Sequence, residues 1–173
     1  METLTATKQK VIIIGAGPSG LLTLKHLKEE PQFEVTVFDA KKQLGGVWLF
    51  SDINEENHPN LNNDAFFKHY GAMHSSLYEE MQVDIPKILM TFKGFPMQTE
   101  FPGFPYAYQF LQYLQAYASH FGLESHLRLD TFVEQTLLTK NLTSDEIKTL
   151  QQYYLASQSQ SQPQVQSQAT TEQ

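Results

Sequence analysis

Three glycines near the N-terminus have the spacing of a phosphate-binding turn. Gly15, Gly17 and Gly20 form the pattern G-A-G-P-S-G. In such a turn the first glycine reverses the chain, the second lets a pyrophosphate approach the backbone, and the third lets a helix pack closely on the strand. Pro18 and Ser19 would begin that helix, whose free N–H groups would face the phosphates. The pattern is also typical of an ordinary strand–helix connection, so its surroundings decide between the two interpretations.

A carboxylate follows the glycines at the distance that a dinucleotide site requires. Asp39 ends the stretch EVTVFD and lies about 20 residues beyond the last glycine. A carboxylate there can accept hydrogen bonds from a ribose diol and would repel a 2′-phosphate, which favours FAD or NAD over NADP. Alternatively, Asp39 merely starts a turn into Lys41 and Lys42. The order of strand, glycines, helix, strand and acid favours dinucleotide binding.

A second glycine pair stands shortly after this acid, in LGGVW at residues 44–48. After Leu44, the residues Gly45 and Gly46 can bring backbone N–H groups against a flat ring, and Trp48 offers a large apolar surface beside it. The alternative is an ordinary glycine turn with a core tryptophan.

The elements that position these residues follow from periodicity and predict an α/β fold. Residues 11–14 are a continuous β-branched run, which predicts a parallel strand buried on both faces. The predicted strands are residues 11–14, 34–38 and 127–133, the predicted helices are residues 18–30, 106–122 and 143–154, and residues 51–64 are a predicted exposed loop. In a doubly wound parallel sheet the three strands would lie in the order 3-2-1. Thr143 and Glu146 resemble a capping box that opens the last helix.

Composition narrows the possible functions. The 173 residues carry a net charge of −7, so a nucleic-acid partner is not expected. There is no cysteine, which excludes disulfides, a thiol nucleophile and a zinc–cysteine site. The six histidines show no pair at the i, i+4 spacing of a helical metal site, so no metal is expected. The apolar run at residues 11–14 is too short for a signal or membrane-spanning segment.

Several motifs together resemble the flavin-containing monooxygenase family. They are GAGPSG at 15–20, LGGVW at 44–48, SLYEEMQVDIPKILMTFKGFP at 76–96 and YLQAYASHFGL at 113–123, and the resemblance spans about residues 8–135. It implies FAD bound by the first glycine turn, Asp39 and the second glycine turn, with Gly46 and Trp48 near the flavin. It also implies an enzyme that uses NADPH and oxygen to oxygenate nitrogen or sulfur of small molecules such as amines and sulfides. The resemblance further suggests a location in the cytoplasm or on the cytosolic face of an internal membrane.

The sequence departs from the family pattern in two places. Asp84 stands where the family has an asparagine, and it is the candidate catalytic residue. An amide there can donate a hydrogen bond, whereas an ionised carboxylate cannot, so Asp84 could serve only if protonated in an apolar pocket. The alternative is an exposed aspartate at a strand end. The family's NADPH-binding domain, with its own glycine fingerprint, is not found in these residues.

These observations predict an incomplete Rossmann-like FAD-binding domain at residues 1–135, a short helical extension at 136–156 and a disordered Gln/Ser-rich tail at 157–173. The chain would be the N-terminal FAD-binding part of a monooxygenase. The alternative is a non-catalytic remnant that keeps the dinucleotide pocket and acts as a binding module, with a partner at the exposed edge of the first strand. Flavin disulfide reductases share the first fingerprint but need a cysteine pair, and this chain has none.

Overall fold

The computed structural model describes residues 8–50, 75–133, 136 and 142–160. The chain divides into two compact units, residues 1–134 and 135–173. The predicted exposed loop at residues 51–64 lies outside the described residues.

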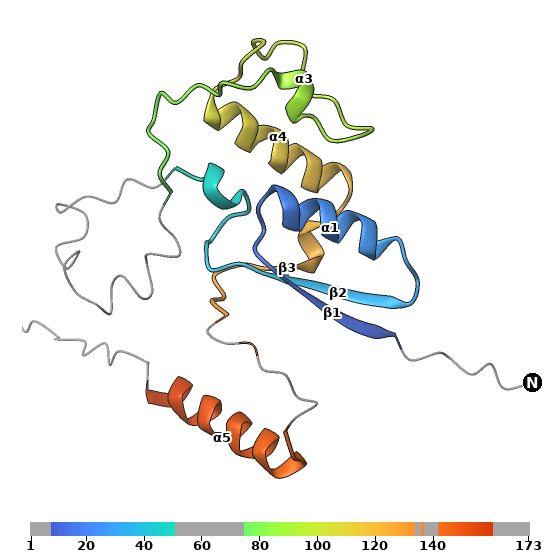
Figure 1. Cartoon of the computed structure of the whole chain (residues 1–173), viewed down its shortest axis with the longest axis vertical. Coiled ribbons are helices and arrows are strands. Elements are labelled where there is room, and N and C mark those ends of the chain that lie inside the picture. The colour runs from blue at the N-terminus through green and yellow to red at the C-terminus, as the bar shows by residue number, and fades with distance from the viewer. Residues whose placement is uncertain (1–7, 51–74, 134–135, 137–141, 161–173) are drawn as a thin grey trace, which may run out of the picture. The chain divides into compact units, whose positions relative to one another are not determined.

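The first unit is built on a parallel sheet of three strands (Figure 1). The strands are β1 (Gln9–Ile14), β2 (Phe33–Phe38) and β3 (Leu127–Arg128), hydrogen-bonded in the order β1-β2-β3. Val11 pairs with Val35, and Val37 pairs with Leu127. The predicted α/β class and the strand order 3-2-1 are therefore confirmed.

The third strand is much shorter than the predicted span of residues 127–133. Asp130 adopts a left-handed backbone conformation with φ +52°, which ends the extended chain. Two hydrogen bonds hold this bend, from Asp130 N to Lys41 O (2.9 Å) and from Thr131 N to Asp39 O (2.9 Å). The alternation of LRLDTFV predicted a strand, but contacts with the end of β2 turn the chain away instead.

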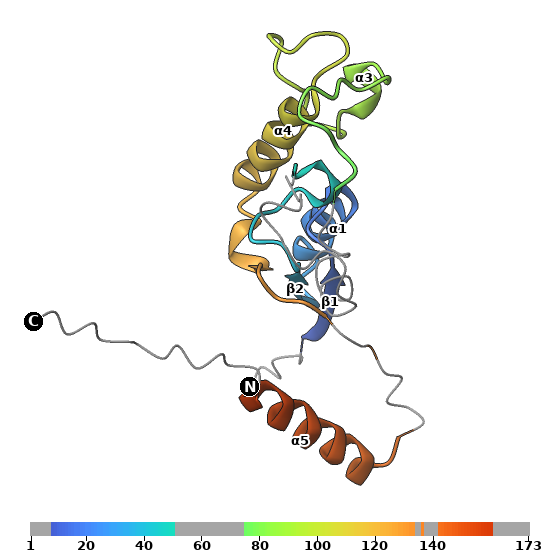
Figure 2. The same ribbon diagram turned by 90° about the vertical axis from the view of Figure 1, so that its left-hand side faces the viewer.

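The two helices predicted in the first unit are observed, together with one short helix and two 3₁₀ turns that were not predicted. They are α1 (Pro18–Lys28), α3 (Lys87–Met90) and α4 (Ala107–His120), with short 3₁₀ turns η1 (Gly46–Trp48) and η2 (Glu124–His126). The helix α1 ends two residues before the predicted Glu30, because a residue that precedes proline disfavours the helical conformation. Gly122, at φ +58°, ends α4 in a Schellman motif, in which Leu123 N donates to Ala118 O (2.9 Å). The short helix α3 lies beside α4 in both views (Figures 1 and 2).

The core joins the two long helices of this unit to one face of the sheet. Its buried members include Leu21 and Leu24 of α1, Val35 and Val37 of β2, and Tyr113, Leu114 and Tyr117 of α4. Val11 and Ile13 of β1 pack against this core, whereas Ile12 and Ile14 are 63% and 59% exposed. The prediction that residues 11–14 are buried on both faces is therefore wrong. Alternate side chains of a strand point to opposite faces of the sheet, and the helices cover the face that carries Val11 and Ile13.

The second unit contains α5 (Ser144–Gln160). Its predicted capping box is confirmed: Glu146 N donates to Thr143 Oγ1 (3.3 Å), and Thr143 N donates to Glu146 Oε2 (2.7 Å). The helix continues past the predicted end at Tyr154, so residues 157–160 of the predicted disordered tail are helical. Glutamine is a good helix former and no proline occurs before Pro163, so the helix can continue beyond Tyr154. Residues 161–173 lie outside the described residues.

No helix among the described residues combines the length and the apolar character that a membrane span needs.

Candidate functional site

The first glycine turn joins β1 to α1 with very little space between them. Gly15 N donates to Phe38 O (2.7 Å), and Gly17 stands in extended conformation just before the helix. A Cβ on Gly20 would lie 1.9 Å from the carbonyl oxygen of Gly15, a distance that no side chain could tolerate. The expected close packing of the helix on the turn is thus observed, and it depends on glycine at position 20.

The beginning of α1 offers free backbone donors. Pro18 is the first residue of the helix and Ser19 is exposed. No side chain caps this end, and no acidic residue lies in the first turn. The N–H groups of the first turn lack intrahelical partners, and the helix dipole adds positive potential there. This set of donors suits an anion such as a pyrophosphate.

The second glycine turn packs directly on the first. Gly45 N donates to Ala16 O (2.9 Å), and a Cβ on Gly46 would lie 2.8 Å from the Cα of Gly17. The sequence predicts that the backbone of Gly17 faces a pyrophosphate. In the structure, one side of that backbone is in contact with Gly46. The two motifs, which lie far apart in the sequence, therefore form one backbone cluster.

Asp39 connects this cluster to the end of β2. Its Oδ2 accepts a hydrogen bond from Ala16 N (2.6 Å) and its Oδ1 accepts one from Lys41 N (2.8 Å). The residue is only 9% exposed, and Ala16 is fully buried. Each carboxylate oxygen has a second lone pair, so Asp39 can also accept hydrogen bonds from a ribose diol. The contact of Asp39 with a ribose therefore stays a prediction. The sequence did not indicate that Asp39 also links the glycine turn to the end of β2.

Lys41 is a site residue that sequence reasoning missed. Its Nζ donates to the carbonyl oxygen of Gly46 (2.8 Å). Burial lowers the pKa of Lys41, and the nearby charge of Asp39 acts in the opposite direction. In the sequence Lys41 looks the same as Lys42, which is exposed, so no local signal separates the two.

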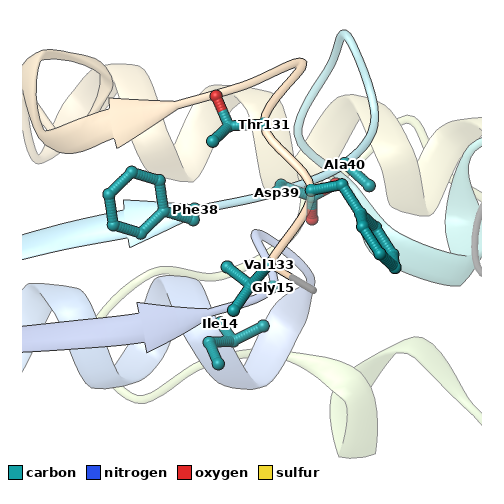
Figure 3. Close-up of a pocket in the computed structure, with 8 residues that line it drawn as sticks. Ile14, Gly15, Phe38, Asp39, Ala40, Thr131 and Val133 are labelled. Carbon is teal, nitrogen blue, oxygen red and sulfur yellow. The ribbon is translucent and has the colours of Figure 1, made fainter. Parts of the chain in front are cut away.

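A cavity of about 180 Å³ opens at the carboxyl ends of β1 and β2 (Figure 3). Its lining residues are Ile14, Gly15, Phe38, Asp39, Ala40, Thr131, Phe132 and Val133. The chain after β3 crosses the ends of β2 and β1 and closes one side of the cavity with Thr131 and Val133 (Figure 3). These two residues were not predicted as site residues, because that stretch was predicted to be a strand.

The position and size of the cavity suit one end of a dinucleotide. In open α/β sheets, ligands bind outside the carboxyl ends of the strands. Ordinary small-molecule pockets measure roughly 300–1,000 Å³, so this cavity would accept only part of a large cofactor. Apolar walls with Asp39 as the acidic group fit a nucleoside, whose ring is flat and whose ribose carries two hydroxyls.

The remaining predicted residues lie around or away from this centre. Leu44 is buried, and Trp48 packs in η1 with its ring centroid 4.4 Å from that of Phe110 in α4. Asp84 is exposed, at a bend between the Gln82–Tyr106 bridge and α3, and it does not line the cavity. Its surroundings are therefore not the apolar pocket that a hydrogen-bond-donating carboxyl needs. Within the described stretches, no cluster of three His, Asp or Glu residues could hold a metal ion.

The chain matches a family model described as "Flavin-binding monooxygenase-like" over residues 8–162. It is 31% identical over 134 residues to flavin-containing monooxygenase FMO GS-OX3 of Arabidopsis thaliana. This alignment covers 73% of this chain and 28% of the Arabidopsis protein. It is 33% identical over 125 residues to flavin-containing monooxygenase 1 of Homo sapiens. This second alignment covers 72% of this chain and 20% of the human protein. The chain thus spans less than a third of the length of these relatives.

Solved structures agree with the sequence comparison. The S-allyl-L-cysteine S-oxygenase of Allium sativum aligns with a TM-score of 0.63 and 25% identity, over 80% of this chain and 31% of that one. Tmm from Pelagibacter sp. aligns with a TM-score of 0.55 and 23% identity, which indicates the same fold.

Proposed function

Because the chain belongs to the flavin-binding monooxygenase-like family, we propose that its first unit binds FAD through the two packed glycine turns. The observation that carries the proposal is the cavity at the ends of β1 and β2, whose lining includes both Gly15 and Asp39. Asp39 would accept hydrogen bonds from the ribose, and the first turn of α1 would receive the pyrophosphate. Leu44, Gly45 and Trp48 would flank the flavin side of the cofactor.

The activity that we propose for the whole protein is the oxygenation of nitrogen or sulfur in small molecules. Bound FAD would supply the redox chemistry and the reaction with oxygen, and NADPH would supply the electrons. The S-allyl-L-cysteine S-oxygenase, whose name specifies a sulfur substrate, supports a sulfide as the first substrate class to test. No second G-x-G-x-x-G occurs in the 173 residues, so they contain no second dinucleotide fingerprint for the nicotinamide cofactor.

A second candidate function is a binding module without catalysis. Asp84 is exposed where the family pattern has an amide, and β1 stands at the edge of the sheet with Ile12 and Ile14 exposed. An apolar edge strand can pair with another chain. Such a module would keep the dinucleotide site and use the edge of β1 for a partner.

Titration calorimetry of FAD into the purified protein tests the proposal. The sharpest variant is Gly17→Ala, because a Cβ there would lie 3.4 Å from the Cα of Gly46, an ordinary contact that the fold accepts. The same Cβ would occupy the space that the pyrophosphate needs, so FAD affinity should fall at least about tenfold. Gly103→Ala is the matched control, since a Cβ there meets nothing within 4 Å. A folded wild-type protein that does not bind FAD would refute the assignment.

Steady-state kinetics tests whether these residues alone carry the complete activity. We expect the FAD-loaded chain not to oxidise NADPH above the background of free flavin, because it contains no second glycine fingerprint to place the hydride donor, and proximity alone is worth about 7–11 kcal/mol of barrier. NADPH oxidation that saturates and is stimulated by a sulfide would show instead that these residues carry the complete activity.

A further inference from the structure

The two glycine turns are held together by a closed circuit of hydrogen bonds. Ala16 donates to Asp39 and accepts from Gly45, while Lys41 donates through its backbone N–H to Asp39 and through Nζ to Gly46. Two of these hydrogen bonds run from a backbone N–H to the carboxylate of Asp39, and the third joins two backbone groups. The fourth, from Lys41 Nζ to Gly46 O at 2.8 Å, is the only one made by a side-chain cation.

We propose that Lys41 is a positioning residue of the cofactor site, whose ammonium ties the second glycine turn to the end of β2 and so holds it against the first turn. The inference rests on the proposed FAD function. Gly46 begins η1 and is in close contact with Gly17, so fixing its carbonyl fixes the backbone that borders the proposed pyrophosphate site.

Charge supports the same role. Asp39 places a carboxylate beside the proposed phosphate site, where it would oppose a bound anion. Burial lowers the pKa of Lys41, and the charge of Asp39 acts in the opposite direction. Burial alone would favour the neutral amine, and a dianionic pyrophosphate nearby would favour the charged form. Lys41 would therefore both shape the turn and offset the charge of Asp39.

The protein contains a built-in reporter for this arrangement. Trp48 is the single tryptophan of the chain and ends the 3₁₀ turn that Gly46 begins. Its contact with Phe110 depends on where that turn lies. Acrylamide quenching of Trp48 emission therefore reports the position of the second glycine turn without any cofactor.

Three substitutions test the proposal in the full chain. Lys41→Met removes both donor and charge, Lys41→Arg keeps both, and Lys42→Met removes one charge from the exposed neighbour. We expect Lys41→Met to raise the quenching of Trp48 and to weaken FAD binding about tenfold, the scale of one hydrogen bond to a charged group. Lys41→Arg should restore both readouts to within about twofold, and Lys42→Met should leave both unchanged. If Lys41→Met does not fold, Lys41→Leu, which also lacks donor and charge, replaces it with the same expectation.

The outcomes distinguish the two proposals. Wild-type quenching in Lys41→Met, or failure of Lys41→Arg to restore either readout, would overturn the positioning role, because a side chain that only fills space would behave in that way. Absence of FAD binding to the wild-type protein would overturn the proposed function instead. In that case the quenching of Trp48 still decides whether Lys41 positions the turn.

Discussion

Replacing Asp39 by asparagine removes one acceptor from the centre of the glycine cluster. The two carboxylate oxygens accept backbone N–H groups from Ala16 at 2.6 Å and from Lys41 at 2.8 Å. An asparagine has one carbonyl oxygen, and its NH₂ group would face the other N–H as a second donor. One charge-assisted bond would be lost and the other would become neutral.

The magnitude follows from these two bonds. A hydrogen bond to a charged group contributes about 1.5–3 kcal/mol, and a neutral one about 1 kcal/mol. Because Ala16 is fully buried, water cannot easily replace the lost acceptor. We therefore expect Asp39→Asn to lower the free energy of unfolding by about 2–4 kcal/mol, a large part of the ~5–15 kcal/mol of a typical domain.

Urea unfolding followed through the emission of Trp48 measures this loss. Asp84→Asn is the matched control, because it removes the same charge from an exposed side chain. We expect it to change the free energy of unfolding by less than about 0.5 kcal/mol. Equal losses in the two variants would show that net charge, rather than the hydrogen bonds of Asp39, accounts for the effect, and the reasoning would fail.

Two further predictions concern the packing of the first unit. Gly20→Ala should prevent stable folding, because its Cβ would lie 1.9 Å from the backbone oxygen of Gly15, whereas Gly103→Ala should be tolerated; circular dichroism of the two purified variants checks this. Burial raises the pKa of Tyr113 and Tyr117 above the usual 10.0, so the stability that depends on their neutral hydroxyls is present below pH 10.0 and is lost as pH rises through the raised values. Alkaline unfolding that coincides with tyrosinate absorbance is expected, and full stability after the tyrosines ionise would contradict it.

The fold class and the glycine motifs were predictable because local patterns carry them. A β-branched run before glycines predicts a parallel strand and its turn, and the pattern of residues 18–30 predicts α1 to within two residues. Strand order follows from the usual topology of doubly wound sheets. Gly122 marked the end of α4 because its left-handed conformation is one that glycine adopts without strain.

The contacts between motifs were not predictable, because they depend on packing between distant segments. Nothing local indicates that Gly46 lies against Gly17, or that Lys41 rather than Lys42 reaches a backbone carbonyl. The bend at Asp130 likewise arises from hydrogen bonds to residues 39–41, about 90 positions earlier in the chain, and not from the alternation around it.

The structural and ligand-binding roles of Asp39 support each other. Its two backbone donors use one lone pair on each oxygen and hold the carboxylate in one orientation at the wall of the cavity. A ribose diol would thus meet acceptors that are already oriented, which lowers the entropic cost of binding. The same bonds close the turn on which α1 begins, where the pyrophosphate would bind. Cofactor binding and closure of the glycine cluster would therefore be coupled through this carboxylate, and a ligand that contacts it would also stabilise the fold by mass action.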